Sequence, residues 1–389
     1  MKRGAVMRIA VLGGGPAGLY FAYLWRKRNP KAAVTLFEQN PAGATFGFGV
    51  VFSDRAMEFL DGDDPETAKL ISARMESWRD IAIVHRGERI IIDGVGFSAI
   101  GRLELLRIFQ TLAEKAGVDL RFGTAITSPS QLDHFDLIVA ADGVNSIIRR
   151  GFEGDFGTSL SYLDEKFAWF GTTMPFETLT QTFIENEFGT FNAHHYRYAP
   201  MMSTFIVECD RATWLHAGLD RLDEESSRAI CERIFADTLE GHRLIANKSL
   251  WRNFPWIWNR RWFHRNMVLV GDALHTAHYS IGSGTRLAME DVLALLKALE
   301  AHPRELTDAL YCYQAERLPI VEKLVEASRV SAAWYANFPE HMKLPPLELA
   351  RSYFMRSGRM DEMRLAQTAP LFAQRLKHEE GLSRKCRLA

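Results

Sequence analysis

The sequence predicts an α/β protein in which a largely parallel sheet is interrupted by a mostly antiparallel one. The chain begins with an apolar run at 9–12, a glycine turn and a helical pattern, which is the order of strand, turn and helix in a nucleotide-binding fold. Apolar runs at 137–141 and 267–270 are typical of parallel strands buried on both faces. Between them, residues 160–260 contain alternating, aromatic-rich stretches that indicate an antiparallel sheet.

Composition limits the class of protein. At 389 residues and 47% hydrophobic, the chain can bury a large core, and we expect two closely joined lobes. A net charge of -1 gives no general basic field to attract nucleic acid or an anionic membrane. The 4 cysteines form no C-x-x-C pair, which favours reduced thiols over disulfides or a metal site. No apolar run has membrane-spanning length and we expect no signal peptide, so the sequence predicts a cytoplasmic protein.

The glycine turn carries the first site prediction. Gly13 permits a tight turn, Gly15 lets the backbone approach a pyrophosphate, and Gly18 lets the helix pack closely on the strand. Pro16 and Ala17 open the helix. Its free amide N–H groups and the positive end of its dipole favour phosphate there without a basic side chain.

A second apolar run, 34–37, leads to Glu38 and Gln39. Glu38 stands where such folds place an acid on the ribose hydroxyls of the nucleotide. A carboxylate at this place favours FAD or NAD over NADP, and the glycine pattern by itself leaves FAD and NAD open.

The loop 46–53 and the helix that begins near Arg102 are candidates for further cofactor contacts. Small residues in the loop allow close backbone approach and Phe48 can face a flat ring, although a buried turn is the alternative. Arg102 can reach a phosphate from the first turn of its helix, or lie on a solvated surface. Strand patterns at 81–84 and 89–92 interrupt the nucleotide-binding strands, so we expect the second lobe to be inserted rather than appended.

Three motifs at the ends of buried strands carry a family resemblance. They are Gly13-x-Gly15-x-x-Gly18, then Asp142-Gly143-x-x-Ser146-x-x-Arg149, then Gly271-Asp272-Ala273-x-His275 with Gly282-x-Gly284. In this order they resemble the group A flavin-dependent aromatic hydroxylases, the 4-hydroxybenzoate hydroxylase fold, over essentially the whole chain.

The resemblance implies a Rossmann-like FAD-binding domain of the glutathione-reductase type, with an inserted, mostly antiparallel substrate domain and C-terminal helices. We expect the FAD-binding domain at 1–75, 101–158 and 263–335, with the last part including long helices. The substrate domain is expected at 76–100 and 159–262, and a C-terminal helical segment at 336–389.

The resemblance also implies FAD as the cofactor. Asp142 would support both FAD and the reduced nicotinamide, Asp272 would contact the FAD ribitol, and backbone at 282–284 can offer N–H groups to the flavin carbonyls. The residues expected at the cofactor are Gly13, Gly15, Pro16, Ala17, Gly18, Glu38, Gln39, Phe48, Arg102, Asp142, Gly271, Asp272, Ser283, Gly284 and Thr285.

The activity implied is that of a single-component monooxygenase. NADH or NADPH would reduce FAD as a transient co-substrate, O2 would add to form a C4a-hydroperoxide, and an electron-rich aromatic ring would receive its distal oxygen. The protein has to exclude water and help to remove the proton that activates the ring. We expect no metal, no nucleic acid and no membrane as partners, and a monomer or homodimer.

The stretch 275–285 departs from the commoner family pattern, in which two prolines and a final asparagine stand where this chain has His278-Tyr279 and Arg286. It resembles a narrower branch that contains the flavin domains of salicylyl-CoA 5-hydroxylase and 2-aminobenzoyl-CoA monooxygenase, and the violacein-pathway hydroxylase. Details at 45–47 and 217–220 favour an aryl-CoA thioester such as salicylyl-CoA as the substrate. An indole or another aromatic natural-product intermediate is the alternative. Relatives of the CoA type commonly continue into a second flavin domain, which we expect to be absent here.

Candidate catalytic residues are His278, Tyr279 and His195. His278 replaces a proline in a loop expected to border the flavin, which makes it the first choice for a proton relay. Because side chains alternate along a strand, only one of His194 and His195 is expected to face the substrate. A satisfied structural histidine is the alternative for each of them, as for His275. Tyr196 is a further polar candidate.

Two other functional hypotheses stay open at this stage. The departures at His278-Tyr279 and Arg286 also suit a flavoprotein that binds a partner without turnover, and Glu38 alone suits an NAD-dependent dehydrogenase. The arginines of 351–364 either contact CoA phosphates or form a solvated helical face.

Overall fold

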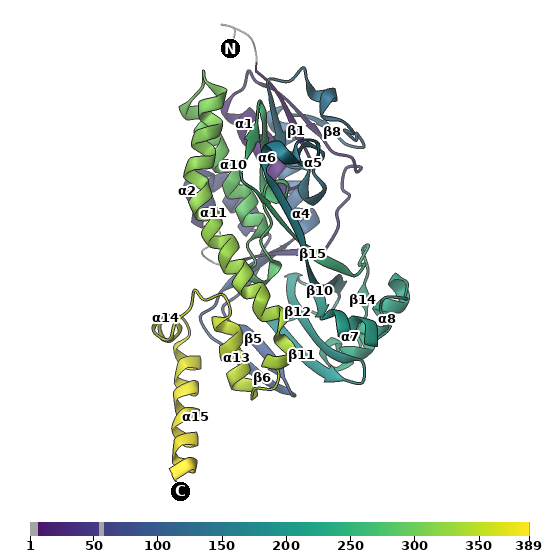
Figure 1. Ribbon diagram of the computed structural model, residues 1–389, viewed down its shortest axis with the longest axis vertical. Helices are drawn as coiled ribbons and strands as arrows, with labels where there is room; N and C mark the ends of the chain where they lie inside the picture. The colour runs from purple at the N-terminus through teal and green to yellow at the C-terminus, as the bar shows by residue number, and fades with distance from the viewer. Residues whose placement is uncertain (1–6, 54–57, 389) are drawn as a thin grey trace.

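A six-stranded, mostly parallel sheet forms the upper part of the molecule in Figure 1. The computed structural model describes residues 7–53 and 58–388. In spatial order the strands are β16 (Phe263–His264), β17 (Met267–Leu269), β9 (Leu137–Ala140), β1 (Arg8–Leu12), β2 (Ala33–Phe37) and β8 (Asp119–Arg121). Every pair is parallel except β16 with β17. The apolar runs of the sequence supply the central strands because both faces of this sheet are covered.

Three helices cover this sheet: α1 (Pro16–Arg28), α4 (Arg102–Ala116) and α10 (Gly284–Ala301). The rings of Tyr20 on α1 and Phe109 on α4 lie 5.2 Å apart and are fully buried. Helix α4 ends at Gly117, whose φ of 82° is the left-handed conformation that glycine adopts at low cost. Short helices flank β9, namely η2 (Pro129–Leu132), η3 (Gly143–Asn145), α5 (Ile147–Gly151) and α6 (Glu153–Phe156).

A second, eight-stranded sheet occupies the lower part of Figure 1. Its spatial order is β14 (Leu244–Ile245), β10 (Thr158–Thr172), β13 (Met202–Cys209), β12 (Gly189–Ala199), β11 (Leu179–Asn186), β5 (Ile81–His85) and β6 (Glu88–Ile92), and β15 (Arg252–Asn259) also pairs with β10. All pairs are antiparallel except β5 with β11. One face packs on α7 (Arg211–His216), α8 (Glu224–Ile234) and α9 (Ala236–Leu239) through a core that includes Phe205 and Phe235.

The other face of this sheet meets a small three-stranded sheet and the connecting loops. That small sheet has the order β3 (Gly49–Ser53), β7 (Phe97–Gly101) and β4 (Glu76–Trp78), and α2 (Glu58–Asp63) and α3 (Pro65–Ser72) lie between β3 and β4 in the chain. The Tyr196 hydroxyl on β12 donates to the carbonyl of Gly49 at 2.9 Å, and the Gly49 N–H donates to Thr204 Oγ1 at 2.8 Å. These bonds fix β3 against the eight-stranded sheet.

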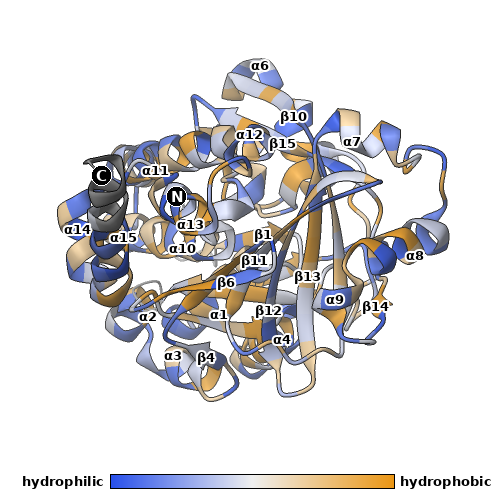
Figure 2. Ribbon diagram, turned by 90° about the horizontal axis from the view of Figure 1, so that it is seen from below, coloured by the Kyte–Doolittle hydropathy of each residue, from blue (hydrophilic) through white to orange (hydrophobic). Residues whose placement is uncertain are grey.

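Helix α11 (Leu306–Ala336) runs along much of the length of the molecule beside α10 (Figure 1). Its first half, including Tyr313, belongs to the core of the six-stranded sheet, and its second half, including Trp334, packs near β5 and β6. The helices that follow are α12 (Phe338–His341), α13 (Pro346–Met355), α14 (Glu362–Thr368) and α15 (Pro370–Leu388). In Figure 2 hydrophilic residues mark outer helices such as α8 and α14, while hydrophobic residues gather on the inner strands.

Two features go beyond the sequence expectations. The tryptophan-rich stretch 251–262 contains the strand β15, which pairs with the long strand β10 through a register shift between Tyr162 and Lys166. The helical segment expected at 336–389 also packs inward, since Leu349, Tyr353 and Phe372 are buried against β5 and β6. Each of these short helices has one polar face and one apolar face. Its overall composition is therefore polar, and composition alone does not reveal the buried apolar side.

Candidate active site

The glycine turn after β1 is shaped by close contacts on one side and open space on the other. A Cβ added at Gly13, where φ is 97°, would lie 2.3 Å from the carbonyl oxygen of Ala141, and one at Gly18 would lie 2.0 Å from the carbonyl oxygen of Gly13. A Cβ at Gly15 would meet nothing within 4 Å. Gly15 is the N-cap of α1, and Pro16 and Ala17 form its first turn. The N-terminus of α1 therefore has room for a phosphate group.

Glu38 lies beside this turn at the end of β2. Its Oε2 accepts the N–H of Gly14 at 2.7 Å, and its Oε1 accepts the backbone N–H of Asn40 at 2.8 Å. Gln39 is exposed at the same strand end. A carboxylate held in this way is placed for the hydroxyls of a ribose that follows the phosphates.

The second motif joins the first and the third. The Oδ2 atom of Asp142 accepts the N–H of Ile147 at 2.8 Å, whereas its Oδ1 is buried with no hydrogen-bond partner among the described residues. Burial raises the pKa of Asp142. The buried guanidinium of Arg149 donates to the carbonyl of Ala273 at 3.1 Å and also to that of Val144. Arg149 thus ties the loop after β9 to the loop after β17.

The third motif lies next to the first turn of α1. A Cβ added at Gly271 would stand 3.6 Å from Cβ of Ala17. Asp272 follows with an exposed side chain, and the charge of Arg102 is close enough to act on it. The backbone N–H of Arg102 donates to the carbonyl of Phe48 at 2.7 Å. The structure therefore brings three motifs, far apart in the sequence, to one edge of the six-stranded sheet.

The N-terminus of α10 completes this group. Ser283 is its N-cap, Gly284 and Thr285 are its first residues, and a Cβ at Gly284 would meet nothing within 4 Å. These features fit the phosphates and hydroxyls of FAD. They are the two helix N-termini with open glycines, the free Oδ1 of Asp142, and the opposite charges of Arg102 and Asp272.

A buried charge network supports the third motif, and the sequence did not reveal it. Asp291 on α10 is 0% exposed, and its Oδ2 accepts from the Gly271 N–H at 3.2 Å and from His275 Nε2 at 2.9 Å. Its Oδ1 accepts from Arg317 Nε at 2.9 Å. Burial raises the pKa of Asp291, but the charges and hydrogen bonds of His275 and Arg317 outweigh it and lower the pKa overall. His275 is therefore engaged in holding the loop.

The expected proton-relay residue His278 lies in a buried aromatic setting. Its ring is 4.9 Å from that of Phe254 and 4.1 Å from that of Tyr279, and its Nδ1 accepts the N–H of Ser280 at 3.4 Å. Burial, with the nearby charge of Arg356, lowers the pKa of His278 to about 3. A neutral imidazole with Nδ1 engaged can donate from Nε2 and can position a ring, but it is a weak base.

A set of buried and half-buried polar groups surrounds this loop, and we call it the interior polar cluster. Its buried members are Glu208 on β13, His194 on β12 and Tyr335 on α11, and its half-buried members are Tyr279 and Arg356, which follows α13. Arg356 donates to the carbonyl of Ser280 at 2.5 Å and lies 3.8 Å from the centre of the Tyr353 ring. A side-chain hydrogen bond joins Glu208 and Tyr279. The sequence expectation of a solvated or CoA-binding arginine at 356 is corrected, because this side chain points inward.

The two adjacent histidines of β12 face opposite sides of the eight-stranded sheet. The His195 ring stacks 5.2 Å from Phe205 and its Nε2 lies 2.9 Å from Thr182 Oγ1, on the side covered by α8 and α9. His194 pairs with Ile206 across the strands and shares the face of Glu208. The structure therefore separates His195 from His278 and Tyr279, whereas the charge of Arg356 acts on both His194 and His278.

Phe48 lies between its loop and this same sheet. A Cβ added at Gly171 on β10 would come within 2.5 Å of the Phe48 ring, so glycine is required there for the ring to pack. Trp169 covers Gly47 in a similar way at 3.1 Å. The loop 46–49 thus connects the expected cofactor region to the face that carries Glu208.

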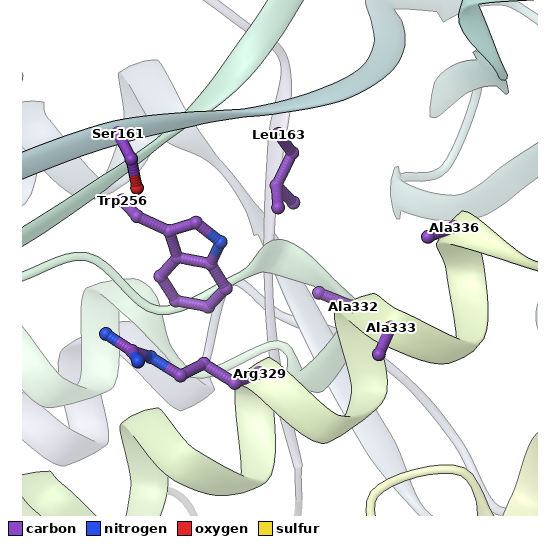
Figure 3. A pocket seen from close by; sticks show the side chains of 7 residues that line it. All are labelled: Ser161, Leu163, Trp256, Arg329, Ala332, Ala333 and Ala336. Carbon is purple, nitrogen blue, oxygen red and sulfur yellow. The ribbon is translucent and has the colours of Figure 1, made fainter.

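A surface groove of about 220 Å³ opens between β10, β15 and α11. Figure 3 shows the Trp256 ring between Ser161 and Arg329, with Ala332 pointing toward it from the helix, and Ala333 also lines the groove. The Trp256 ring contacts Phe254 at 5.4 Å, and Phe254 in turn lies 5.8 Å from Tyr279. Two aromatic rings therefore separate this groove from the interior polar cluster.

Two other site types are absent from residues 7–53 and 58–388. No group of three metal-ligating side chains is found in this part of the chain. No helix in the same ranges combines the length and apolarity needed to cross a membrane.

The comparisons with known proteins agree with this geometry. Residues 6–328 match the family model described as an FAD binding domain. The chain is 39% identical over 361 residues to a salicyloyl-CoA 5-hydroxylase of Streptomyces sp, covering 90% of this chain and 70% of that protein. It is 38% identical to the 3-hydroxy-4-methyl-anthranilyl-[aryl-carrier protein] 5-monooxygenase of Streptosporangium sibiricum, covering 86% and 90%. The protodeoxyviolaceinate monooxygenase of Chromobacterium violaceum is 30% identical, with 92% and 96% covered.

The fold is also found among solved structures. That of 2-methyl-3-hydroxypyridine-5-carboxylic acid oxygenase superposes with a TM-score of 0.67 over 95% of this chain and 98% of that chain, at 16% identity. A likeness at this identity concerns the fold alone. The family model and the relatives at 30–39% identity settle the assignment. The chain belongs to the FAD-dependent aromatic monooxygenases with an FAD binding domain of this family.

Proposed function

We propose that this monooxygenase hydroxylates an electron-rich aromatic ring that is presented as an acyl thioester, with NADH or NADPH as the reductant. Two of the relatives are named for substrates attached to CoA or to an aryl-carrier protein, and this supports the proposal. The observation that carries it is the groove beside Trp256, which opens at the surface. Only the rings of Trp256 and Phe254 lie between this groove and Tyr279 of the interior polar cluster. A long arm lying in this groove would bring its ring to Trp256 and Phe254, the two side chains that lie between the groove and the cluster.

Within this proposal, the residues at the edge of the six-stranded sheet hold the cofactor. The amide of Gly15 would face the phosphates of FAD and that of Gly284 the flavin. Glu38 would contact the ribose, and Asp272 would contact the ribitol. When bound, FAD supplies the redox and oxygen-activating chemistry. The loop with His278 and Tyr279 borders the substrate ring.

The aromatic walls keep water away from the substrate. Phe167, Phe254 and Tyr279 lie close together, with ring centres 5.1 Å apart for Phe167 and Tyr279 and 5.8 Å for Phe254 and Tyr279. A dry setting strengthens each polar contact with the reacting ring and limits side reactions. The interior polar cluster then supplies the groups that orient the ring and move its proton.

The experiment is a substrate screen with the purified protein reconstituted with FAD. Salicyloyl-CoA, free salicylate and indole are compared, each with NADH and with NADPH, and the hydroxylated product and the reductant consumed are measured. We expect coupled product formation with salicyloyl-CoA and little with free salicylate. Equal turnover of salicylate, or product from indole alone, contradicts the thioester proposal. Bound FAD with no substrate-stimulated oxidation of NADH or NADPH indicates a flavoprotein without turnover.

A further inference from the structure

Glu208 is a buried carboxyl group that the cofactor site does not use. It lies near the end of β13 opposite Phe167 of β10 and Asn192 of β12, and it is 3% exposed. Neighbours across antiparallel strands project to the same side of the sheet. Glu208 therefore shares a face with Phe167 and His194, on the side away from α8 and α9.

The charged and titratable groups around Glu208 come from four other elements. Arg356 after α13 acts on it with the opposite charge, Tyr279 hydrogen-bonds to it, and Glu165 on β10 acts on it with a like charge. Its own charge acts on Tyr335 of α11. Among the described residues, Arg356 is the cation that acts on this carboxyl, and it also donates hydrogen bonds to the carbonyls of Ser280 and Tyr353.

Several buried polar atoms of the interior polar cluster have no hydrogen-bond partner among the described residues. They are Glu208 Oε1, Arg356 Nε and both ring nitrogens of His194. Buried polar atoms are hydrogen-bonded in nearly all native structures, so a group of unpaired atoms indicates a ligand or ordered water. A ligand that offers an O–H or N–H donor would satisfy the free oxygen of Glu208.

We propose that Glu208 binds the hydroxyl or amino substituent of the substrate ring and accepts its proton, with Tyr279 and Arg356 as positioning residues. This inference rests on the proposed function, because it assumes that an aromatic substrate reaches the cluster. In the step, the O–H or N–H bond of the substrate breaks and its proton goes to Glu208 Oε1. The bonding electron pair stays on the substrate oxygen or nitrogen and increases the electron density of the ring. The proton transfer itself needs no oxidant or reductant.

The neighbouring residues are less suited to this role. His278 has its Nδ1 engaged and a pKa lowered to about 3, and His194 has a pKa lowered to about 3 by burial and the charge of Arg356. Burial raises the pKa of Tyr279 well above its usual value, so it stays a neutral donor. Burial raises the pKa of Glu208 to about 8, which brings its basicity closer to that of a phenol.

The test is a comparison of two ligands on two proteins. Binding of salicyloyl-CoA and of benzoyl-CoA, which lacks the ring hydroxyl, is measured by calorimetry on the FAD-loaded wild type and on Glu208→Gln. We expect Glu208→Gln to weaken salicyloyl-CoA binding by about 10- to 100-fold, the range of a hydrogen bond to a charged group, and benzoyl-CoA by less than about threefold. Equal losses for both ligands, or a hydroxyl preference that survives in the variant, overturn the assignment.

The pH dependence separates a proton acceptor from a packing residue. In the wild type the preference for salicyloyl-CoA over benzoyl-CoA should rise as the pH passes through about 8, and it should be flat in Glu208→Gln. The hydrogen bond from Tyr279 lowers the pKa of Glu208, so Tyr279→Phe should move the midpoint to higher pH. The like charge of Glu165 raises that pKa, so Glu165→Gln, the matched control, should keep the preference and move the midpoint to lower pH. A midpoint that neither variant moves argues against Glu208 as the titrating group.

Thermal unfolding of each variant checks that it is folded. If Glu208→Gln does not fold, the shift of the pH midpoint in Tyr279→Phe tests the same assignment. If neither thioester binds the wild type, the proposed thioester function fails. The same comparison is then made with phenol and toluene, for which a hydroxyl preference lost in Glu208→Gln supports the acceptor role and one that persists overturns it.

Discussion

His275 Nε2 lies 2.9 Å from Oδ2 of Asp291, and this buried pair fixes the loop that carries Asp272. The same Oδ2 accepts the N–H of Gly271, where the backbone turns with a φ of 58°. Arg317 holds the other oxygen of Asp291. The orientation of the loop toward the cofactor therefore depends on a carboxylate of α10 that acts through the backbone of Gly271 and the side chain of His275.

Asp291→Asn should destabilise the protein by about 3 kcal/mol at neutral pH, because it leaves the buried guanidinium of Arg317 without one of its two carboxylate partners. The matched control is Glu300→Gln on the same helix, whose partly exposed pair with Arg28 at 3.2 Å contributes about 1 kcal/mol or less. Chemical unfolding of both variants measures the difference. Equal losses of unfolding free energy would contradict the role given to Asp291.

Asp291 also predicts a direction for the pH dependence of stability. Its pKa in the folded protein lies below the ordinary value, so its contribution is present above about pH 4 and is lost as the pH falls through the folded value. The stability lost between pH 5 and acid should therefore be smaller in Asp291→Asn than in the wild type. Unfolding curves at several pH values check this, and parallel curves for the two proteins would speak against it.

Alanine at Gly15 and alanine at Gly18 should have different effects, on FAD affinity and on protein stability respectively, although both residues belong to one turn. A methyl group at Gly15 meets nothing within 4 Å, so Gly15→Ala should fold normally and weaken FAD by about tenfold or more, because the methyl occupies space needed by the pyrophosphate. A methyl group at Gly18 would stand 2.0 Å from the carbonyl oxygen of Gly13, so Gly18→Ala should lower the stability of the protein without FAD. FAD titration and thermal unfolding of the FAD-free proteins distinguish the two effects. Unchanged FAD affinity in Gly15→Ala would remove the turn from the cofactor site.

His278→Ala should retain FAD but couple reductant use poorly to product. The neutral ring of His278 packs on Phe254 and Tyr279, so its loss should loosen the substrate ring while the residues at the cofactor stay in place. We expect more hydrogen peroxide and less hydroxylated product per NADH or NADPH consumed. Phe254→Leu, which keeps an apolar side chain, is the comparison variant. An unchanged ratio of peroxide to product in His278→Ala would make His278 a structural residue only.

Parts of this arrangement could be predicted from sequence because their signals are local. The turn at 13–18 and the helices after 284 and 306 follow from adjacent glycines and from helical periodicity. The interior polar cluster was missed because Glu208 and Arg356 come together only through tertiary packing. Glu208 gave one weak signal, a charged residue ending the alternating strand 203–208.

The choice between His194 and His195 shows a similar limit. Alternation predicts that they face opposite sides, but only the packing of α8 and α9 decides which side is covered. The strand β15 was missed for a related reason, since its pairing depends on the long strand β10, more than eighty residues earlier in the chain. Its two tryptophans and its proline also do not alternate clearly with polar residues.

The last prediction concerns the groove beside Trp256. Ala333 on α11 lines it with an exposed side chain, so Ala333→Trp should fold normally and fill much of the volume of about 220 Å³. If the thioester arm lies there, the variant should bind salicyloyl-CoA about tenfold more weakly or worse, because the indole excludes the arm, while FAD affinity and the turnover of any free aromatic acid stay unchanged. Ile320→Trp is the matched control, since Ile320 is 50% exposed on the same helix and does not line the groove. Equal affinities of the two variants for salicyloyl-CoA would show that the arm lies elsewhere, whereas a loss confined to Ala333→Trp assigns the groove to the arm.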